Sequence, residues 1–382
     1  MTKEFIEFVR NYFHVPHDFI PLHAPVFRGR EIEYLTDSIN STFVSSVGAY
    51  VDRFEEMMRS ITGANYAVAT VNGTAALHIA LHSAGIGVGD EVITQPLSFV
   101  ATANAIRYTG ADPVFVDVDL DSMSLSPNAL LKFLESECEY QNHFVINKRT
   151  GKRIKAVVPM HTFGNPGRIE EICEISEKFR IDVIEDSAES LGSFVKGKHT
   201  GTFGRLGIFS FNGNKTVTCG GGGAVITNDE ILGKRLKHIT TTAKVPHPWE
   251  YTHDELGFNY RMPNLNAALA CAQLEQLEDF LIKKRNLTEQ YISFFEHTEI
   301  KFKLELSGSR SNYWLNTIEF PNQESRDYFL NETNNAKVMT RPVWNLLNTL
   351  PMFVNCSTGS LENSTYLAAR LVNIPSGLPW KN

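Results

Sequence analysis

Cysteine is scarce in this chain, and its distribution argues against two kinds of site. The 382 residues include five cysteines, an odd number, and no two of them form a C-x-x-C pair: they are Cys138, Cys173, Cys219, Cys271 and Cys356. This pattern argues against a metal centre and against a disulfide framework. We therefore expect a protein of a reducing compartment, the cytoplasm, with no metal site.

The sequence also lacks long apolar runs and an excess of basic residues. Its first ten residues mix charged and apolar side chains, and no segment resembles a signal peptide or a stop-transfer span. The 36 Lys and Arg residues are outnumbered by 43 Asp and Glu residues, which gives a formal net charge of −7. A nucleic-acid-binding domain is expected to carry a basic patch. The composition thus predicts a soluble protein with neither nucleic acid nor a membrane as a partner.

The chain does contain ample apolar material in an alternating pattern. Hydrophobic residues make up 42% and charged residues 21%, so a sizeable core is expected. Short apolar runs alternate with helical patterns; Ile169, Ile172 and Ile175, for example, recur at helical spacing between two such runs. Repeated β-α-β units predict an α/β fold with a mostly parallel central sheet and flanking helices. The expected strands are 66–71, 91–94, 113–118, 156–160, 181–185, 207–211 and 224–227.

The length favours more than one domain. We expect a large domain at 1–260, which includes the N-terminal segment, and a second part at 261–382. Pro263 and Asn264 begin a helical apolar pattern that continues to about Phe295, with Asn264 as a candidate N-cap. This long helix is predicted to bridge to a smaller C-terminal α/β domain.

Lys215 is the residue that most strongly indicates a chemical function. It follows a strand candidate in a loop of small residues, and the apolar run 181–186 upstream ends in Asp186. A lysine amine can form a Schiff base with an aldehyde cofactor, and an aspartate can hold the pyridinium nitrogen of that cofactor. Taken alone, a surface lysine in a glycine-rich loop and an aspartate that caps a turn are the commoner interpretations.

Further candidates lie where strands are expected to end, which is where open parallel sheets bind ligands. Gly73 and Thr74 stand between a strand and a helix, where free N–H groups and the helix dipole attract a phosphate; an ordinary N-cap is the commoner explanation. Ser210, five residues before Lys215, offers a hydroxyl to the same phosphate. Phe99 is placed to stack on a cofactor ring, with core packing as the alternative.

Six segments resemble, in the same order, the DegT-type sugar aminotransferases, which are pyridoxal-phosphate enzymes of fold type I. The resemblance extends from about Ile20 to Pro375. It implies that fold, a pyridoxal 5'-phosphate cofactor and an amino-transfer reaction. The segments are Asn72–Leu77, Ser98–Asn104, His161–Pro166, Glu185–Glu189, Phe209–Lys215 and Gly257–Met262.

The resemblance implies a role for each matching residue. Lys215 would carry the cofactor as a Schiff base and later move protons, and Asp186 would bind the ring nitrogen. Phe99 would stack on the ring. Some relatives have His in place of this lysine and act as sugar dehydratases, so the lysine favours amino transfer. The phosphate would be held by Gly73, Thr74 and Ser210.

Two matching positions imply more than ordinary cofactor contacts. Asn259 matches a residue that reaches the phosphate from the neighbouring subunit, so a homodimer with shared active sites is implied. Glu189 stands where relatives usually carry Gln or His near the phenolic oxygen of the ring. A carboxylate there would be repelled by the phenolate unless it is protonated or turned away.

The acceptor is suggested by resemblance to one subgroup. Segments 43–48, 311–316 and 340–344 resemble enzymes that aminate UDP-linked 4-keto-6-deoxy-N-acetylglucosamine for surface-glycan sugars, with L-glutamate as the amino donor. Core packing is the alternative for a tryptophan here, an ion pair for an arginine, and a structural role for a histidine. The candidate substrate contacts are Ser46, His161, Arg261, Trp314 and Arg341.

Other functions stay open at this point. The same cofactor chemistry suits amination of a 3-keto sugar or a cyclitol ketone. A non-catalytic binding or regulatory protein is a second alternative, although it would need no aldehyde-binding lysine. A nucleotide-dependent oxidoreductase ranks lowest, because the glycines 220–223 do not match the G-x-G-x-x-G fingerprint.

Overall fold

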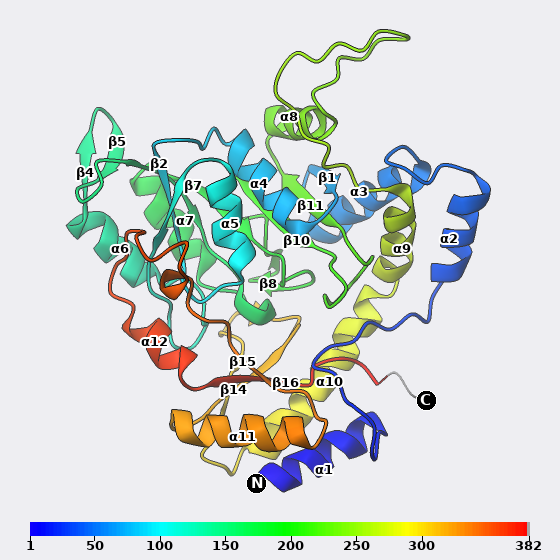
Figure 1. The fold of residues 1–382 in the computed structure, drawn as a ribbon, viewed down its shortest axis with the longest axis vertical. Coiled ribbons are helices and arrows are strands. Elements are labelled where there is room, and N and C mark those ends of the chain that lie inside the picture. The colour runs from blue at the N-terminus through cyan, green and yellow to red at the C-terminus, as the bar shows by residue number, and fades with distance from the viewer. Residues whose placement is uncertain (380–382) are drawn as a thin grey trace.

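The computed structural model describes residues 1–379, and its centre is a nine-stranded sheet (Figure 1). The five strands at one end of the sheet, which begin with Leu206–Ser210 and end with Asp112–Phe115, form four neighbouring pairs, and all four pairs are parallel. The second strand in the order below is antiparallel to both of its neighbours. The expected mostly parallel sheet is therefore confirmed. The order is β1 (Tyr66–Thr70), β11 (Gly223–Thr227), β10 (Leu206–Ser210), β7 (Asp182–Asp186), β6 (Arg153–Val158), β2 (Asp90–Thr94) and β3 (Asp112–Phe115), with β4 (Cys138–Gln141) and β5 (Phe144–Asn147) pairing beside β6.

Both faces of this sheet are buried, which explains why its strands appear in the sequence as continuous apolar runs. In β6, Ala156 and Val158 pack into one hydrophobic cluster, whereas Val157 packs into another on the opposite face. The first cluster includes residues of α4 (Gly73–Ser83), α5 (Val100–Tyr108) and α8 (Glu230–Thr240). The other face is covered by α3 (Ala49–Thr62), α6 (Pro127–Ser136), α7 (Ile169–Lys178) and α9 (Asn264–Leu274), with α2 (Glu31–Asn40) against α9.

A smaller antiparallel sheet forms the C-terminal α/β part, as expected. Its order is β12 (Lys301–Phe302), β14 (Asn316–Glu319), β16 (Leu371–Ile374) and β15 (Arg341–Pro342). The long α10 (Leu277–Phe295) runs from the large sheet to this one (Figure 1). The remaining elements are α11 (Gln323–Asn335), α12 (Glu362–Ala368), the short helices η1 (Thr162–Gly164) and η2 (Leu347–Thr349), and a sheet of β13 (Ser309–Arg310), β8 (Phe194–Val195) and β9 (Lys198–His199).

The N-terminal segment departs from the expected division of the chain. We expected it with the large domain, but α1 (Thr2–Phe13) packs into the C-terminal cluster beside α10 and α11 (Figure 1). Phe5, Val9 and Phe13 form the buried stripe of this amphipathic helix. This stripe covers apolar residues of the small sheet and of α10. Hydrophobic burial therefore holds α1 against the C-terminal part. A domain boundary at 260 stays a prediction for the rest of the chain.

The predicted bridging helix is two helices, and its predicted N-cap is wrong. The helical pattern breaks at Glu275 and Gln276, between α9 and α10. The side chain of Asn264 does not cap α9, whose N-cap position is Pro263. Its amide oxygen accepts the N–H of Tyr50 (3.1 Å), and its amide nitrogen donates to the carbonyl of Phe43 (2.6 Å). The side chain therefore ties the segment before α3 to α9.

The loop after α8 extends away from the body of the protein (Figure 1). Its apolar side chains Trp249, Tyr251 and Leu256 are 76%, 80% and 75% exposed. Within residues 1–379, no helix combines the length and the apolar character that a bilayer crossing requires.

Lys284 of α10 has a buried side chain whose hydrogen-bond partners among residues 1–379 are two carbonyl oxygens. Its ammonium donates to Ser376 (2.6 Å) and Trp314 (3.2 Å). Burial lowers the pKa of Lys284 from 10.5 to about 7. Between these values the unfolded chain binds a proton that the folded chain lacks, so wild-type stability rises with pH across this window.

Replacing Lys284 with Met removes that proton linkage. The variant should therefore gain on the wild type as the pH is lowered, by roughly 3 kcal/mol between pH 10 and pH 7, because each unit of pKa shift corresponds to about 1.4 kcal/mol. Urea unfolding at both pH values measures this difference. Lys283→Met is the matched control, since Lys283 is 43% exposed and pairs with Asp279. An equal difference at the two pH values would contradict the buried-cation account.

Candidate active site

A cavity of about 410 Å³ lies at the carboxyl ends of the parallel strands, with Lys215 in its wall. Asp186 ends β7 and Ser210 ends β10, while Gly73 begins the helix that follows β1. Every predicted cofactor-binding residue except Asn259 lines this lysine cavity, and so does Trp314. The residues that line it include Gly73, Thr74, Phe99, Thr102, Asp186, Glu189, Ser210, Asn214, Lys215, Trp314 and Trp344.

The amine of Lys215 is held between a carboxylate and an aromatic face. Its Nζ lies 3.2 Å from Oε1 of Glu189 and 3.9 Å from the ring centroid of Trp314. The Trp314 ring is fixed in turn, because its Nε1–H donates to the carbonyl of Asn214 at 2.7 Å. The lysine side chain is 14% exposed. Lys215 is therefore an enclosed lysine that faces a cavity, which argues against the surface-loop alternative.

Asp186 presents a buried carboxylate to the same cavity. One carboxylate oxygen accepts the hydroxyl of Thr102 (2.8 Å), and the other accepts the N–H of Ala188 (3.2 Å). Burial is the largest influence on this carboxyl and raises its pKa, while the two hydrogen bonds and Lys215 oppose the shift. A protonated ring nitrogen would supply the cation that this carboxylate lacks at hydrogen-bonding distance.

The start of α4 is built to receive an anion. Asn72 caps the helix by accepting the N–H of Ala75 at 2.7 Å, which leaves the N–H groups of Gly73 and Thr74 without an acceptor in the helix. These donors lie at the positive end of the helix dipole. A Cβ on Gly73 would lie 2.7 Å from Cβ of Ser210, so only glycine lets the two segments approach this closely.

Glu189 is the most deeply buried ionisable partner of Lys215. Its side chain is 1% exposed, and its second carboxylate oxygen accepts the N–H of Phe163 at 2.9 Å. Phe163 has a φ of 58°, a conformation that L-residues rarely adopt. Burial raises the pKa of Glu189 to about 7, and the nearby Lys215 charge opposes that shift.

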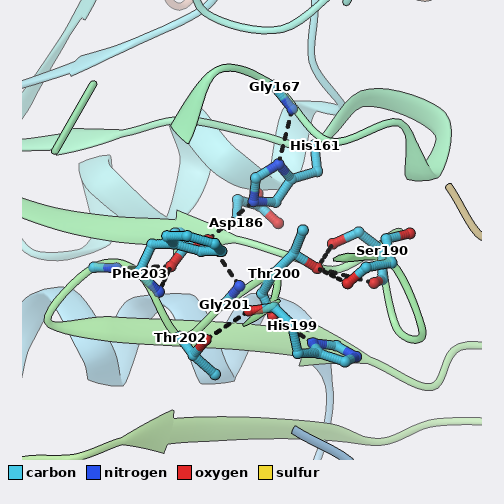
Figure 2. A network of polar contacts seen from close by, with 12 residues as sticks. His161, Gly167, Asp186, Ser190, His199, Thr200, Gly201, Thr202 and Phe203 are labelled. Atoms are coloured by element: carbon cyan, nitrogen blue, oxygen red, sulfur yellow. Dashed lines mark hydrogen bonds and ion pairs between the residues drawn. The ribbon is translucent and has the colours of Figure 1, made fainter. Parts of the chain in front are cut away.

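His161 is part of the structural support behind β7 (Figure 2). Its Nδ1 accepts the N–H of Gly167 (3.2 Å), so its Nε2 carries the proton and donates to Glu185 (3.0 Å). Glu185 also accepts the N–H groups of Gly201 (2.7 Å) and Phe203 (2.6 Å). His161 has no ring nitrogen free for a substrate and does not line the lysine cavity, so its geometry supports the structural alternative.

The other predicted substrate residues are not all brought together. Ser46 and Arg261 line a separate cavity of about 210 Å³, which we call the Ser46 cavity. Arg341 is exposed and lines neither of these cavities. Trp314 lines the lysine cavity, and so does Trp344, which was not among the predicted substrate contacts. Within one chain, the predicted substrate contacts are thus not gathered in one place: Ser46 and Arg261 line one cavity, Trp314 lines another, and His161 and Arg341 line neither.

Sequence reasoning missed Thr102 and the backbone of Phe163. Thr102 is buried, and its hydroxyl links Ser98 (2.8 Å) to Asp186 (2.8 Å). Its position in the first turn of α5, after the end of β2, was the available signal, because strand-to-helix turns at this edge of the sheet carry the site. The N–H of Phe163 that binds Glu189 has no sequence signal, since any residue type provides a backbone donor.

These features fit pyridoxal phosphate. An enclosed lysine amine, a buried aspartate that lacks a bonded cation and a helix start with free N–H groups surround one cavity. Together with the mostly parallel sheet, they define a pyridoxal-phosphate-dependent enzyme of fold type I.

Comparison with known proteins places the chain within that class. Residues 25–379 match the model of the DegT/DnrJ/EryC1/StrS aminotransferase family, and the chain belongs to this family. The GDP-perosamine synthase of Escherichia coli O157:H7 is 37% identical over 335 residues, which are 88% of this chain and 87% of that protein. The protein is accordingly a pyridoxal-phosphate-dependent aminotransferase.

Solved structures agree in fold. A DegT DnrJ EryC1 StrS aminotransferase from Brucella abortus superposes with a TM-score of 0.83 at 26% identity, over 92% of this chain and 91% of that one. The PLP form of Spr1654 from Streptococcus pneumoniae superposes with a TM-score of 0.82 at 21% identity, over 94% and 93%.

Gly73→Ala tests the close approach of α4 to Ser210. The added methyl group must displace Ser210 or the helix start, and overpacking of this kind typically costs about 1–3 kcal/mol. The pyridoxal phosphate concentration for half-maximal loading should therefore rise by about 5- to 150-fold. Gly87→Ala is the control, because its Cβ would meet nothing closer than 3.9 Å and it lies outside the lysine cavity. Equal affinities for the two variants would remove Gly73 from the phosphate site.

Proposed function

We propose that this aminotransferase moves the amino group of L-glutamate to a nucleotide-linked 4-keto-6-deoxy sugar. UDP-4-keto-6-deoxy-N-acetylglucosamine is the proposed acceptor, and the cytoplasm is the proposed location. The observation that carries the proposal is the joint placement of Lys215, Asp186 and the start of α4 around one cavity. Two tryptophans, Trp314 and Trp344, border the same cavity and offer apolar faces to a sugar or a base.

The residues divide the work by position. When bound, pyridoxal phosphate would accept the electron pair that stays on the donor's α-carbon as its hydrogen leaves as a proton. Asp186 holds the ring nitrogen, and Gly73, Thr74 and Ser210 hold the phosphate. Lys215 Nζ takes the proton from the donor's α-carbon and later returns one to the acceptor carbon. Phe99, which lines the cavity and is 51% exposed, would stack on the ring.

The separation of the predicted contacts supports a homodimer. Asn259 is exposed and does not line the lysine cavity, and Ser46 and Arg261 line the Ser46 cavity. The buried Nε of Arg261 has no hydrogen-bond partner among residues 1–379. We therefore propose that Asn259, Ser46 and Arg261 complete the lysine cavity of a second copy.

The sugar acceptor has two candidate nucleotides, UDP and GDP. The E. coli relative is a GDP-perosamine synthase, which makes a GDP-linked acceptor the strongest competitor to a UDP-linked one. Residues 43–48, 311–316 and 340–344 favour the UDP-linked acceptor. A panel of UDP- and GDP-linked 4-keto-6-deoxy sugars, with a 3-keto sugar included, decides between them.

Absorption spectra of the wild type and Lys215→Ala test the central assignment. The wild type loaded with cofactor should show the long-wavelength band of a lysine-bound aldehyde, and L-glutamate should convert it to the shorter-wavelength band of the amine form. Lys215→Ala should lack the lysine-bound band and turn over at least about 10²-fold more slowly, the lower range for loss of a general base. A wild type without either band would show that Lys215 is not the cofactor lysine.

Mixing two inactive variants tests the shared site. Lys215→Ala and Asn259→Ala each damage one half of the composite site, so a mixed dimer regains one intact site of two. After dissociation and random reassociation at equal amounts, activity should recover to about a quarter of the wild-type value. Each variant reassociated alone is the control. No recovery, despite mixed dimers detected by mass spectrometry, would place all catalytic residues within one chain.

A further inference from the structure

Glu189 and Lys215 form a buried ion pair that the proposed transfer reaction does not itself require. Their atoms are 3.2 Å apart, with the carboxylate side chain 1% exposed and the lysine side chain 14% exposed. The pair faces the lysine cavity, where an incoming aldehyde would meet it. An ammonium cannot attack an aldehyde, because its nitrogen has no free electron pair. The lysine must therefore lose a proton before it can bond to the cofactor.

The geometry leaves one oxygen of Glu189 available for this task. Oε2 is occupied by the N–H of Phe163, and Oε1 is the atom that meets Lys215. The other charged group that acts on Glu189 is Asp186, which ends β7 and accepts hydrogen bonds from Thr102 and Ala188. His23, from the segment after α1, also senses the charge of Lys215, but burial lowers its pKa and keeps it neutral.

We propose that Glu189 is the proton acceptor for the Lys215 ammonium when this lysine condenses with the cofactor aldehyde. The step balances as follows: the ammonium gives one proton to the Glu189 carboxylate, the freed amine forms a carbon–nitrogen double bond with the aldehyde carbon, and the aldehyde oxygen leaves as water. The ion pair becomes a neutral carboxylic acid beside a neutral nitrogen. The inference rests on Lys215 as the cofactor lysine in the proposed function.

The electrostatics of the site favour retention of that proton. Burial raises the pKa of Glu189 to about 7, and the positive charge of Lys215 is the main influence that opposes the rise. Above pH 7 the carboxylate is thus ionised while the ammonium is present. Once the ammonium charge is lost, that opposition disappears and the pKa rises further. At pH 8 Glu189 should therefore accept the proton and keep it.

Proton counting during cofactor loading tests this role directly. Full-length protein, resolved from its cofactor, is mixed with pyridoxal phosphate in weak buffer with a pH indicator, at pH 5 and at pH 8. Glu189→Gln should release about one proton more per site than the wild type at pH 8, because no carboxylate captures it. At pH 5, where Glu189 is already protonated, the two proteins should release the same number. The loading rate at pH 8 should fall about 10²-fold in the variant.

The controls separate this role from a structural one. The glutamine oxygen can still accept the N–H of Phe163, so the loop is preserved; Glu189→Met, which has no titratable group, is the second variant if the first does not fold. Glu278→Gln makes the same chemical change at a 71% exposed side chain outside the lysine cavity and should give the wild-type proton count. Equal proton counts for the wild type and Glu189→Gln at pH 8 would overturn the inference while leaving the proposed function intact. A lysine-bound band in Lys215→Ala would overturn both.

Discussion

The carboxylate of Glu185 fixes the end of β7, and the chemistry of the cavity depends on that position. It accepts N–H groups of Gly201 (2.7 Å), Phe203 (2.6 Å) and Gly204 (2.7 Å), as well as the ring of His161 (3.0 Å). Because side chains alternate along a strand, this anchor on one face aims the next residue, Asp186, at the other. One dipeptide thus provides both the support and the reactive carboxylate. The Glu185 side chain therefore has a hydrogen-bond donor for each of its oxygens within the fold.

The cavity itself has the opposite character, because its charges are incompletely paired. Two buried carboxylates, Asp186 and Glu189, share one lysine at the carboxyl edge of the sheet. Such an arrangement is costly in the absence of a ligand, and a cationic ring nitrogen beside Asp186 relieves it. Local instability of this kind is common where a site is prepared for its cofactor. The support behind β7 keeps the residues in place despite that cost.

Much of the site was predictable because it lies on local patterns. The expected strand at 66–71 corresponds to β1, and the candidates Gly73, Asp186 and Ser210 do lie at strand or helix ends around one cavity. The errors concern long-range packing. Asn264 was expected to cap a helix, but its side chain binds Phe43 and Tyr50, which no local pattern indicates.

Other features of the site could not be predicted from the sequence of one chain. The resemblance implied that Ser46 and Arg261 contact the substrate in the site of Lys215, yet within one chain they line another cavity. Which residues lie close together depends on how segments distant in sequence pack in the fold. In a site shared by two subunits, it depends on the second chain as well. The donor to Glu189 is equally hidden, since it is the backbone N–H of Phe163.

The position of α1 has a consequence for the synthesis of the protein. Phe5, Val9 and Phe13 leave the ribosome before their partners in β14 and β16, which are made about 300 residues later. At about 5–20 residues per second, that interval lasts roughly 15 to 60 s. During this time the apolar stripe of α1 has no native surface to cover. The nascent chain therefore exposes the apolar side chains of α1 until β14 and β16 have been made and can cover them.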